Sequence, residues 1–135
     1  MPPKPLRLTP LPDAYFVYRL PPETALPETL CRAQGVFCAR TAEELSLLLP
    51  AGCEAPAYTR REGPWRGFRV AGALEFSLVG VLARVSGVLA AAGVPILAVS
   101  TFDTDYFWVP ADRWPDARRA LGQAHDLSLE DAHDG

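Results

Sequence analysis

Two short segments carry residue types that could bind a small charged molecule. The first opens an apolar helical pattern and consists of Glu75, Phe76, Ser77, Leu78, Val79 and Gly80; the second contains Thr101, Phe102, Asp103 and Asp105. Free backbone N–H groups at residues 78–80 would face an anion such as a carboxylate, which the helix dipole favours. Asp105, or less directly Glu75 or Asp103, could hold an ammonium or guanidinium group. Two such poles suit a zwitterionic amino acid.

The same residues also have a purely structural interpretation. Asp and Thr are ordinary turn formers, while Gly72 and Ser77 are ordinary residues at the end of a strand and the start of a helix. Gly80 favours binding, because a residue without a side chain lets a ligand approach the backbone. Spacing alone leaves both interpretations open.

Other chemistries find no support in the residue pattern. His125 and His133 have no spaced Cys or His partner, and Cys31, Cys38 and Cys53 form no CxxC pair. We therefore predict neither a zinc site nor a disulfide framework. The sequence has no recognisable Ser/His/Asp or Cys/His set, P-loop or GxGxxG pattern. We expect a protein that is not an enzyme and that has no metal and no cofactor.

Composition narrows the function classes further. The 135 residues are 49% hydrophobic and 21% charged, enough for one compact domain or two small lobes. The net charge of −3 argues against nucleic-acid binding, which needs clustered positive charge. The longest apolar stretch, residues 87–99, is too short to span a bilayer, and the N-terminus lacks a signal-peptide core. A cytoplasmic protein without membrane contact is expected.

The spacing of apolar residues predicts a helix over residues 78–92. Ser77 would be its N-cap and Gly93 would end it. Its apolar residues recur every three or four positions, which places them on one stripe: Leu78, Val81, Leu82, Val85, Val88, Leu89 and Ala92.

The elements around this helix predict a complete β-α-β-β-α-β unit. Asp112 could cap a second helix, with Trp114, Ala117, Leu121 and Ala124 facing inward. The predicted strands are 65–71, 95–102, 105–109 and 127–130. This order is the split, ferredoxin-like arrangement of an α+β fold, with both helices on one face of an antiparallel sheet. In that topology the end of strand 65–71, the start of helix 78–92 and the turn after residue 100 meet at one edge.

The N-terminal half is rich in proline and in predicted strands. Strands are expected over residues 6–11, 14–20, 36–41 and 45–49, and residues 42–44 could form one helical turn. Residues 40–50 align without gaps on residues 100–110, an offset of 60 that suggests an internal repeat. Pro21, Pro22 and Pro27 interrupt the place where the first helix of such a copy would lie. We therefore expect a reduced lobe over residues 1–64 and a complete domain over 65–135.

The C-terminal segments resemble the ACT domain family. The most specific part is the Ser-Thr-Phe-x-x-Asp turn at residues 100–105, supported by segments 70–83 and 96–110. Residues 37–47 resemble the first-lobe motif of one subgroup, an aromatic strand followed by Thr-x-x-Glu. That subgroup includes the cytosolic arginine sensors called CASTOR and many small bacterial proteins.

The resemblance implies a regulatory module that binds amino acids, with sites between paired modules. In the arginine sensors the positions matching Asp105, with Thr101 and Phe102 beside it, and the loop 75–80 contact the ligand. This chain departs from them by having one lobe pair instead of two, which leaves the identity of the ligand open.

We therefore expect an amino-acid sensor that forms a homo-oligomer. The nearly uncharged second face of helix 78–92 supports self-association. The alternative is an interaction or dimerisation module with no small-molecule ligand.

Overall fold

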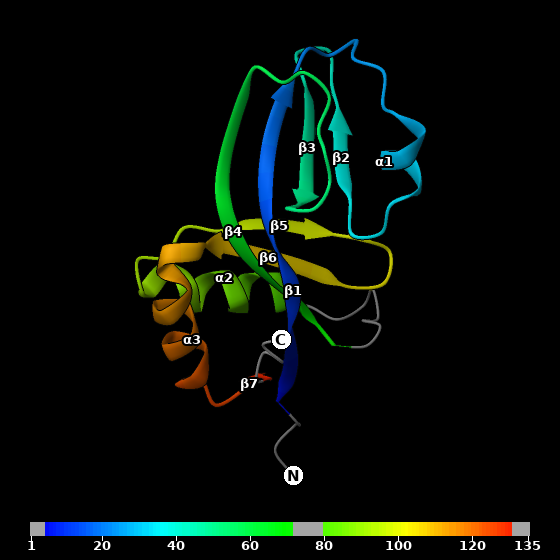
Figure 1. The fold of residues 1–135 in the computed structure, drawn as a ribbon. Coiled ribbons are helices and arrows are strands. Elements are labelled where there is room, and N and C mark those ends of the chain that lie inside the picture. The colour runs from blue at the N-terminus through cyan, green and yellow to red at the C-terminus, as the bar shows by residue number, and fades with distance from the viewer. Residues whose placement is uncertain (1–4, 72–79, 131–135) are drawn as a thin grey trace. The chain divides into compact units, whose positions relative to one another are not determined.

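A computed structural model describes residues 5–71 and 80–130, which form two compact units. Unit 1 comprises Met1–Pro12 with Arg66–Gly135, and unit 2 comprises Asp13–Trp65. Two long strands, β1 (Leu6–Leu20) and β4 (Arg60–Val70), each contribute residues to both units (Figure 1).

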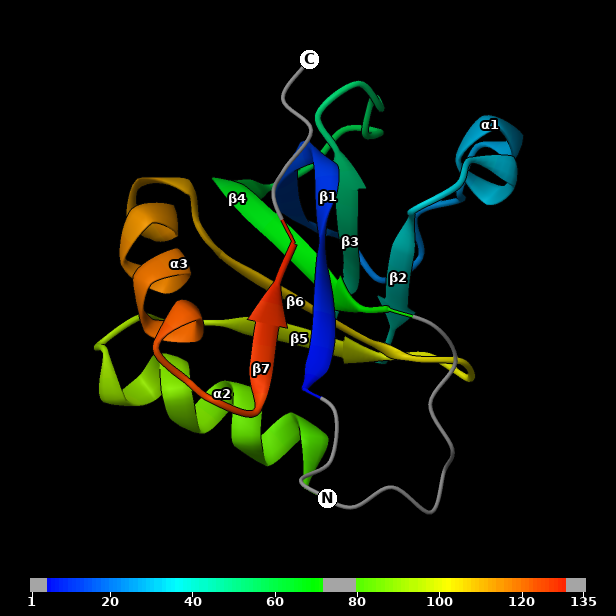
Figure 2. The ribbon, with the colours of Figure 1, turned by 90° about the horizontal axis from the view of Figure 1, so that it is seen from below.

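Unit 1 contains the helices and strands predicted for the C-terminal half. These are α2 (Val81–Ala91), β5 (Leu97–Ser100), β6 (Asp105–Pro110), the short 3-10 helix η1 (Ala111–Arg113), α3 (Trp114–Gly122) and β7 (Leu127–Leu129). Figures 1 and 2 show α2 and α3 beside the strands of this unit. The fold class predicted from the sequence, ferredoxin-like α+β, is confirmed.

One face of the strands packs against both helices of unit 1. Val85 and Leu89 of α2 and Leu121 of α3 are fully buried against Phe68 and Phe107, whose rings stack at 5.4 Å. The predicted inner residues Trp114 and Ala117 belong to the same core, and Ala124 is partly buried against it. The alternation of side chains along β6 places the fully buried Trp108 on the opposite face.

The sheet of unit 1 differs from the prediction in one strand. In its order, β7-β1-β4-β6-β5, the first part of β1 lies between β7 and β4. Leu6–Leu8 pair in parallel with Leu127–Leu129, and the N–H of Ala71 donates to the carbonyl of Arg7 at 2.8 Å. Residues 65–130 therefore do not complete this sheet by themselves, because a segment from the chain's N-terminus fills its middle.

Unit 2 has the strand order β4-β1-β3-β2, with β2 at Phe37–Arg40 and β3 at Leu45–Pro50. A short helix, α1 (Glu28–Arg32), follows Pro27 and buries Leu30 among core residues of β1 and β3. The predicted strands 6–11 and 14–20 are one continuous strand, β1. Residues 42 and 43 form a bend, and residues 42–44 are not helical.

The hairpin β2–β3 of unit 2 corresponds to the hairpin β5–β6 of unit 1 at an offset of 60 residues. β2 and β3 have the same lengths as β5 and β6, and Arg40 pairs with Leu45 as Ser100 pairs with Asp105. Duplication of the whole lobe, with a boundary near residue 64, stays a prediction.

Candidate functional site

The turn between β5 and β6 is closed by its two threonines. The N–H of Thr101 donates to the carbonyl of Thr104 at 2.9 Å, and the Thr101 hydroxyl donates to the same carbonyl at 3.1 Å. In return the N–H of Thr104 donates to Thr101 Oγ1 at 3.3 Å. This local bonding presents Phe102, whose side chain is 79% exposed, at the tip of the turn.

The same turn is fastened to the end of β4. The hydroxyl of Thr104, 6% exposed, donates to the carbonyl of Val70 at 2.9 Å. Two of the three parts that the sequence placed at one edge, the strand end and the turn, are therefore in contact. Sequence reasoning missed Thr104; the signal for it was a second threonine three residues after Thr101.

The start of α2 differs in detail from the expectation. The helix begins at Val81, and its N-cap is Gly80 with φ +87° and no side-chain cap, so Ser77 is not the N-cap. The N–H groups without intrahelical partners are therefore those of residues 81–83 instead of 78–80. The first α-helical bond runs from the N–H of Arg84 to the carbonyl of Gly80 at 2.8 Å.

Gly80 suits a close approach to the backbone. A Cβ atom added there would meet no described residue within 4 Å, and the positive φ favours glycine. Figures 1 and 2 show the N-terminal end of α2 at the same end of unit 1 as the β5–β6 turn. The predicted site residues Glu75, Phe76, Ser77, Leu78 and Val79 lie outside the described residues.

Asp105 is the candidate for the anionic pole that binds a cation. Its side chain is half-buried at the start of β6, where the residue pairs with Ser100. Within the described part of the chain its carboxylate has no hydrogen bond or ion pair. The exposed Asp103 lies two residues earlier in the same turn.

A nearby cation at the start of α2 is already engaged. Nε and Nη2 of Arg84 donate to the two carboxylate oxygens of Asp126 at 2.7 and 2.8 Å. This hydrogen bonding lowers the pKa of Asp126 and raises the pKa of Arg84. The guanidinium of Arg84 is therefore paired with Asp126.

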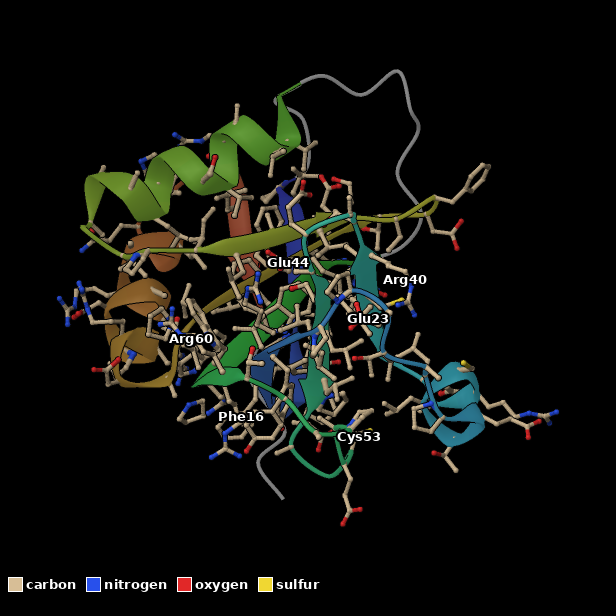
Figure 3. The ribbon with its side chains drawn as sticks, turned by 90° about the horizontal axis from the view of Figure 1, so that it is seen from above. Phe16, Glu23, Arg40, Glu44, Cys53 and Arg60 are labelled. Atoms are coloured by element: carbon tan, nitrogen blue, oxygen red, sulfur yellow. The ribbon has the colours of Figure 1, made fainter. Side chains whose placement is uncertain are left out.

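The equivalent turn in unit 2, between β2 and β3, has the same hydrogen bonds, but the residue before it makes different contacts. Thr41 and Glu44 repeat the bonds of Thr101 and Thr104, with the Thr41 N–H to Glu44 carbonyl distance again 2.9 Å. Arg40, labelled in Figure 3, lies at the position equivalent to Ser100 and donates to the carbonyls of Pro22 and Thr24. The sequence analysis aligned Arg40 with Ser100 at the offset of 60 residues but did not predict these contacts of Arg40.

No other type of site emerges from the parts that the structure describes. Residues 5–71 and 80–130 contain no group of three or more His, Cys, Asp or Glu side chains arranged to hold a metal ion. Among the same residues, no helix is both long and apolar enough to cross a membrane.

Comparisons with known proteins agree with the fold. Residues 60–123 match the family model of the ACT domain. No curated protein matches the chain. The resemblance to ACT domains is thus supported, whereas the narrower resemblance to the CASTOR-type sensors stays a prediction.

Three solved structures illustrate the similarity. A crystal structure of an Agrobacterium tumefaciens protein has 29% identity and a TM-score of 0.81, with 99% of each chain covered. A Vibrio cholerae protein of unknown function, described as a possible transport protein, has 20% identity and a TM-score of 0.63, covering 90% of this chain and 91% of that one. Aspartate kinase from Synechocystis has 16% identity and a TM-score of 0.59; the match covers 98% of this chain and 28% of the kinase.

Proposed function

We propose that this protein is a non-catalytic regulatory domain that binds an amino-acid-like ligand at the end of unit 1 formed by the β5–β6 turn and the start of α2. The observation that carries the proposal is the half-buried carboxylate of Asp105, which lacks a partner among the described residues and lies beside a turn closed by hydrogen bonds of Thr101 and Thr104. The match of residues 60–123 to a family of ligand-binding regulatory domains supports it.

The two poles of the ligand would be held by different chemistry. Asp105 would accept hydrogen bonds from an ammonium or guanidinium group, and such charge-assisted bonds are the stronger kind. The N–H groups at the start of α2 would hold the carboxylate, with Gly80 giving access. Thr101, Phe102 and the segment 75–79 would shape the pocket. Arginine or lysine is the first choice of ligand, and a neutral amino acid also matches the two poles.

A thermal-shift screen against free amino acids tests the proposal. A ligand at 100 times its dissociation constant should stabilise the protein by about 2.7 kcal/mol. Calorimetry should then show that Asp105→Ala weakens binding by about 1.5–3 kcal/mol, the usual contribution of a hydrogen bond to a charged group. Asp112→Ala, which removes an exposed carboxylate of η1 in the same unit, is the matched control and should bind like wild type. Equal affinities of the Asp105 variant and wild type would remove Asp105 from the site.

A second candidate, a docking module without a small ligand, rests on a groove between α2 and α3. This groove has a volume of about 400 Å³ and small side chains along its walls, including Gly87, Ala91, Ala120 and Ala124. Small residues allow another surface to approach closely, and we expect self-association through this face. Light scattering that shows only monomer at about 50 μM, a concentration at which ordinary weak dimers form, would count against it.

A further inference from the structure

Unit 2 contains a groove that shares no residue with the site proposed in unit 1. It has a volume of about 190 Å³ and lies between Arg19 of β1, Glu44 and Ser46 at the start of β3, and residues 60–62 at the start of β4. Figure 3 labels Glu44 and Arg60 on two of these segments. A space of this size lies below the range of about 300–1,000 Å³ that is usual for drug-sized ligands, so it suits a smaller molecule.

One side of the groove is lined by Glu44, an acidic residue whose carboxylate has no partner among the described residues. Glu44 is half-buried, and within the described chain its carboxylate takes part in no hydrogen bond or ion pair, because its contacts with Thr41 use backbone atoms. The hydroxyl of Ser46 is also half-buried without a partner there. Polar groups that lose water normally gain hydrogen bonds, so two such groups in one groove favour a polar occupant.

The arginines of the groove are oriented by other groups and not by Glu44. Arg61 lies over the ring of Phe16, 4.4 Å from its centroid, and Arg19 donates to the carbonyl of Glu43 at 3.3 Å. Arg60 pairs with Glu62 at 3.4 Å. Each guanidinium has five N–H donors, so Arg19 and Arg61 keep most of theirs for a ligand. Among the described residues, the Glu44 carboxylate therefore forms no ion pair with any of the three arginines of the groove.

We propose that this groove binds an acidic amino acid, a molecule with two carboxylates and one ammonium group. Once Arg60 and Glu62 are counted as a pair, the lining offers two cations, Arg19 and Arg61, and one anion, Glu44. The complementary ligand carries two negative charges and one positive charge. Its ammonium group donates to Glu44 and Ser46, and its carboxylates accept from the arginines, whose planar fork suits a carboxylate.

The experiment is a titration of the full chain with L-glutamate and L-aspartate, followed by calorimetry and amide NMR shifts. Glutarate, which lacks the ammonium group, and L-glutamine, which lacks the second carboxylate, are the matched ligands. We expect saturable shifts at residues 17–19, 44–46 and 60–62, with glutarate and L-glutamine each at least about tenfold weaker. Glu44→Gln and Arg61→Gln should each weaken L-glutamate binding at least about tenfold, whereas Glu43→Gln should not change it.

Three results would overturn this proposal. The first is the absence of saturable shifts in the groove up to about 10 mM ligand, a concentration that reveals even millimolar affinity. The second is L-glutamate binding by Glu44→Gln that equals wild type. The third is loss of L-glutamate binding in Asp105→Ala. The last result would place an acidic ligand in unit 1. If instead Asp105→Ala keeps L-glutamate binding, this proposal stands whatever happens to the site in unit 1. Unfolding curves of Glu44→Gln and Arg61→Gln that match wild type show that neither effect is a folding defect.

Discussion

The hydroxyl of Thr104 donates a hydrogen bond of 2.9 Å to the carbonyl of Val70 and thereby joins the β5–β6 turn to the end of β4. The bond is buried and links residues 34 positions apart. It holds the turn that carries Asp105 against the sheet. Because a net hydrogen bond contributes about 0.5–1.5 kcal/mol, its removal should be measurable both in stability and at the site.

Thr104→Val should lower the free energy of unfolding by about 1 kcal/mol. Valine has nearly the shape of threonine but cannot donate to the Val70 carbonyl. Urea denaturation measures the change, and amide exchange should show faster opening at residues 101–105. Thr104→Ser, which keeps the hydroxyl, is the control. A valine variant as stable as wild type would show that the bond has no net effect.

Gly67→Ala should destabilise unit 1 by about 1–3 kcal/mol, the usual cost of an extra methyl group in a packed core. A Cβ atom at residue 67 would lie 2.5 Å from Nε1 of Trp108 and 2.7 Å from Cδ1 of Leu11. Trp108 is fully buried, so its ring has little room to move. Thermal unfolding with tryptophan fluorescence reads out the change, and an unchanged midpoint would refute the expected crowding.

In contrast to Gly67→Ala, Gly87→Ala should stabilise the protein, by about 0.5–1 kcal/mol. Gly87 lies inside α2, is exposed, and has nothing within 4 Å of an added Cβ. Alanine has the higher helix propensity, and no described residue would be crowded by the added methyl group. Since Gly87 also lines the groove between α2 and α3, weaker self-association of this variant would support docking there.

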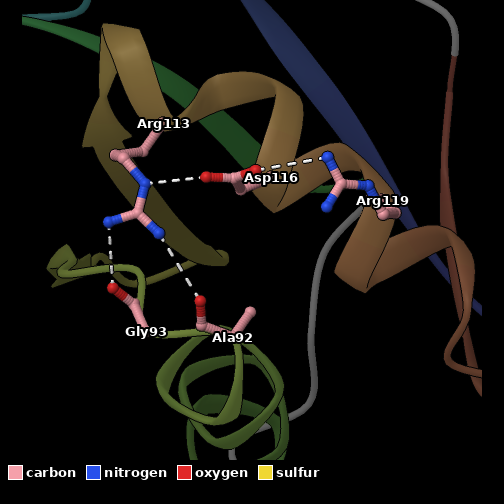
Figure 4. A network of polar contacts seen from close by, with 5 residues as sticks. All are labelled: Ala92, Gly93, Arg113, Asp116 and Arg119. Carbon is pink, nitrogen blue, oxygen red and sulfur yellow. Dashed lines mark hydrogen bonds and ion pairs between the residues drawn. The ribbon is translucent and has the colours of Figure 1, made fainter.

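The ion-pair network at the start of α3 should make stability depend on pH. Asp116 accepts from Arg113 at 2.8 Å and from Arg119 at 3.2 Å, and Arg113 also donates to the carbonyls of Ala92 and Gly93 (Figure 4). The hydrogen bond from Arg113, more than any other cause, lowers the pKa of Asp116.

A lowered carboxyl pKa means that the stabilisation is complete above the unfolded pKa of about 3.9 and is lost as the pH falls through the lower folded value. Asp116→Asn should therefore unfold at a lower temperature than wild type at pH 7, with the difference disappearing in strong acid. Asp112→Asn, an exposed carboxylate in the preceding turn, is the control. A difference that stays constant from pH 7 to about pH 2 would show that ionisation of Asp116 is not its source.

The sequence predicted much of the local structure because local structure depends on neighbours a few residues apart. The apolar spacing from Val81 to Leu89 predicted α2, and the Ser-Thr-Phe-x-x-Asp segment predicted the turn between β5 and β6, where the Thr101 side chain bonds to nearby backbone. The offset of 60 residues in the sequence also aligned two hairpins, β2–β3 and β5–β6, whose strands pair in the same register. The start of α2 was placed three residues too early, since Ser77 and Gly80 are both acceptable caps and only the backbone path selects between them.

The pairing of distant segments was decided by tertiary structure alone. Leu6–Leu8 enter the sheet of unit 1 through backbone bonds to residues near 71 and 130, and backbone bonds carry no residue-specific signal. Likewise, Glu44 came to lie in one groove with three arginines, without an ion pair among the described residues, only when β1, β3 and β4 came together. The type and charge of each residue can be read from the sequence. Whether two charges pair or face an open groove depends on the distances between them, which only the folded chain sets.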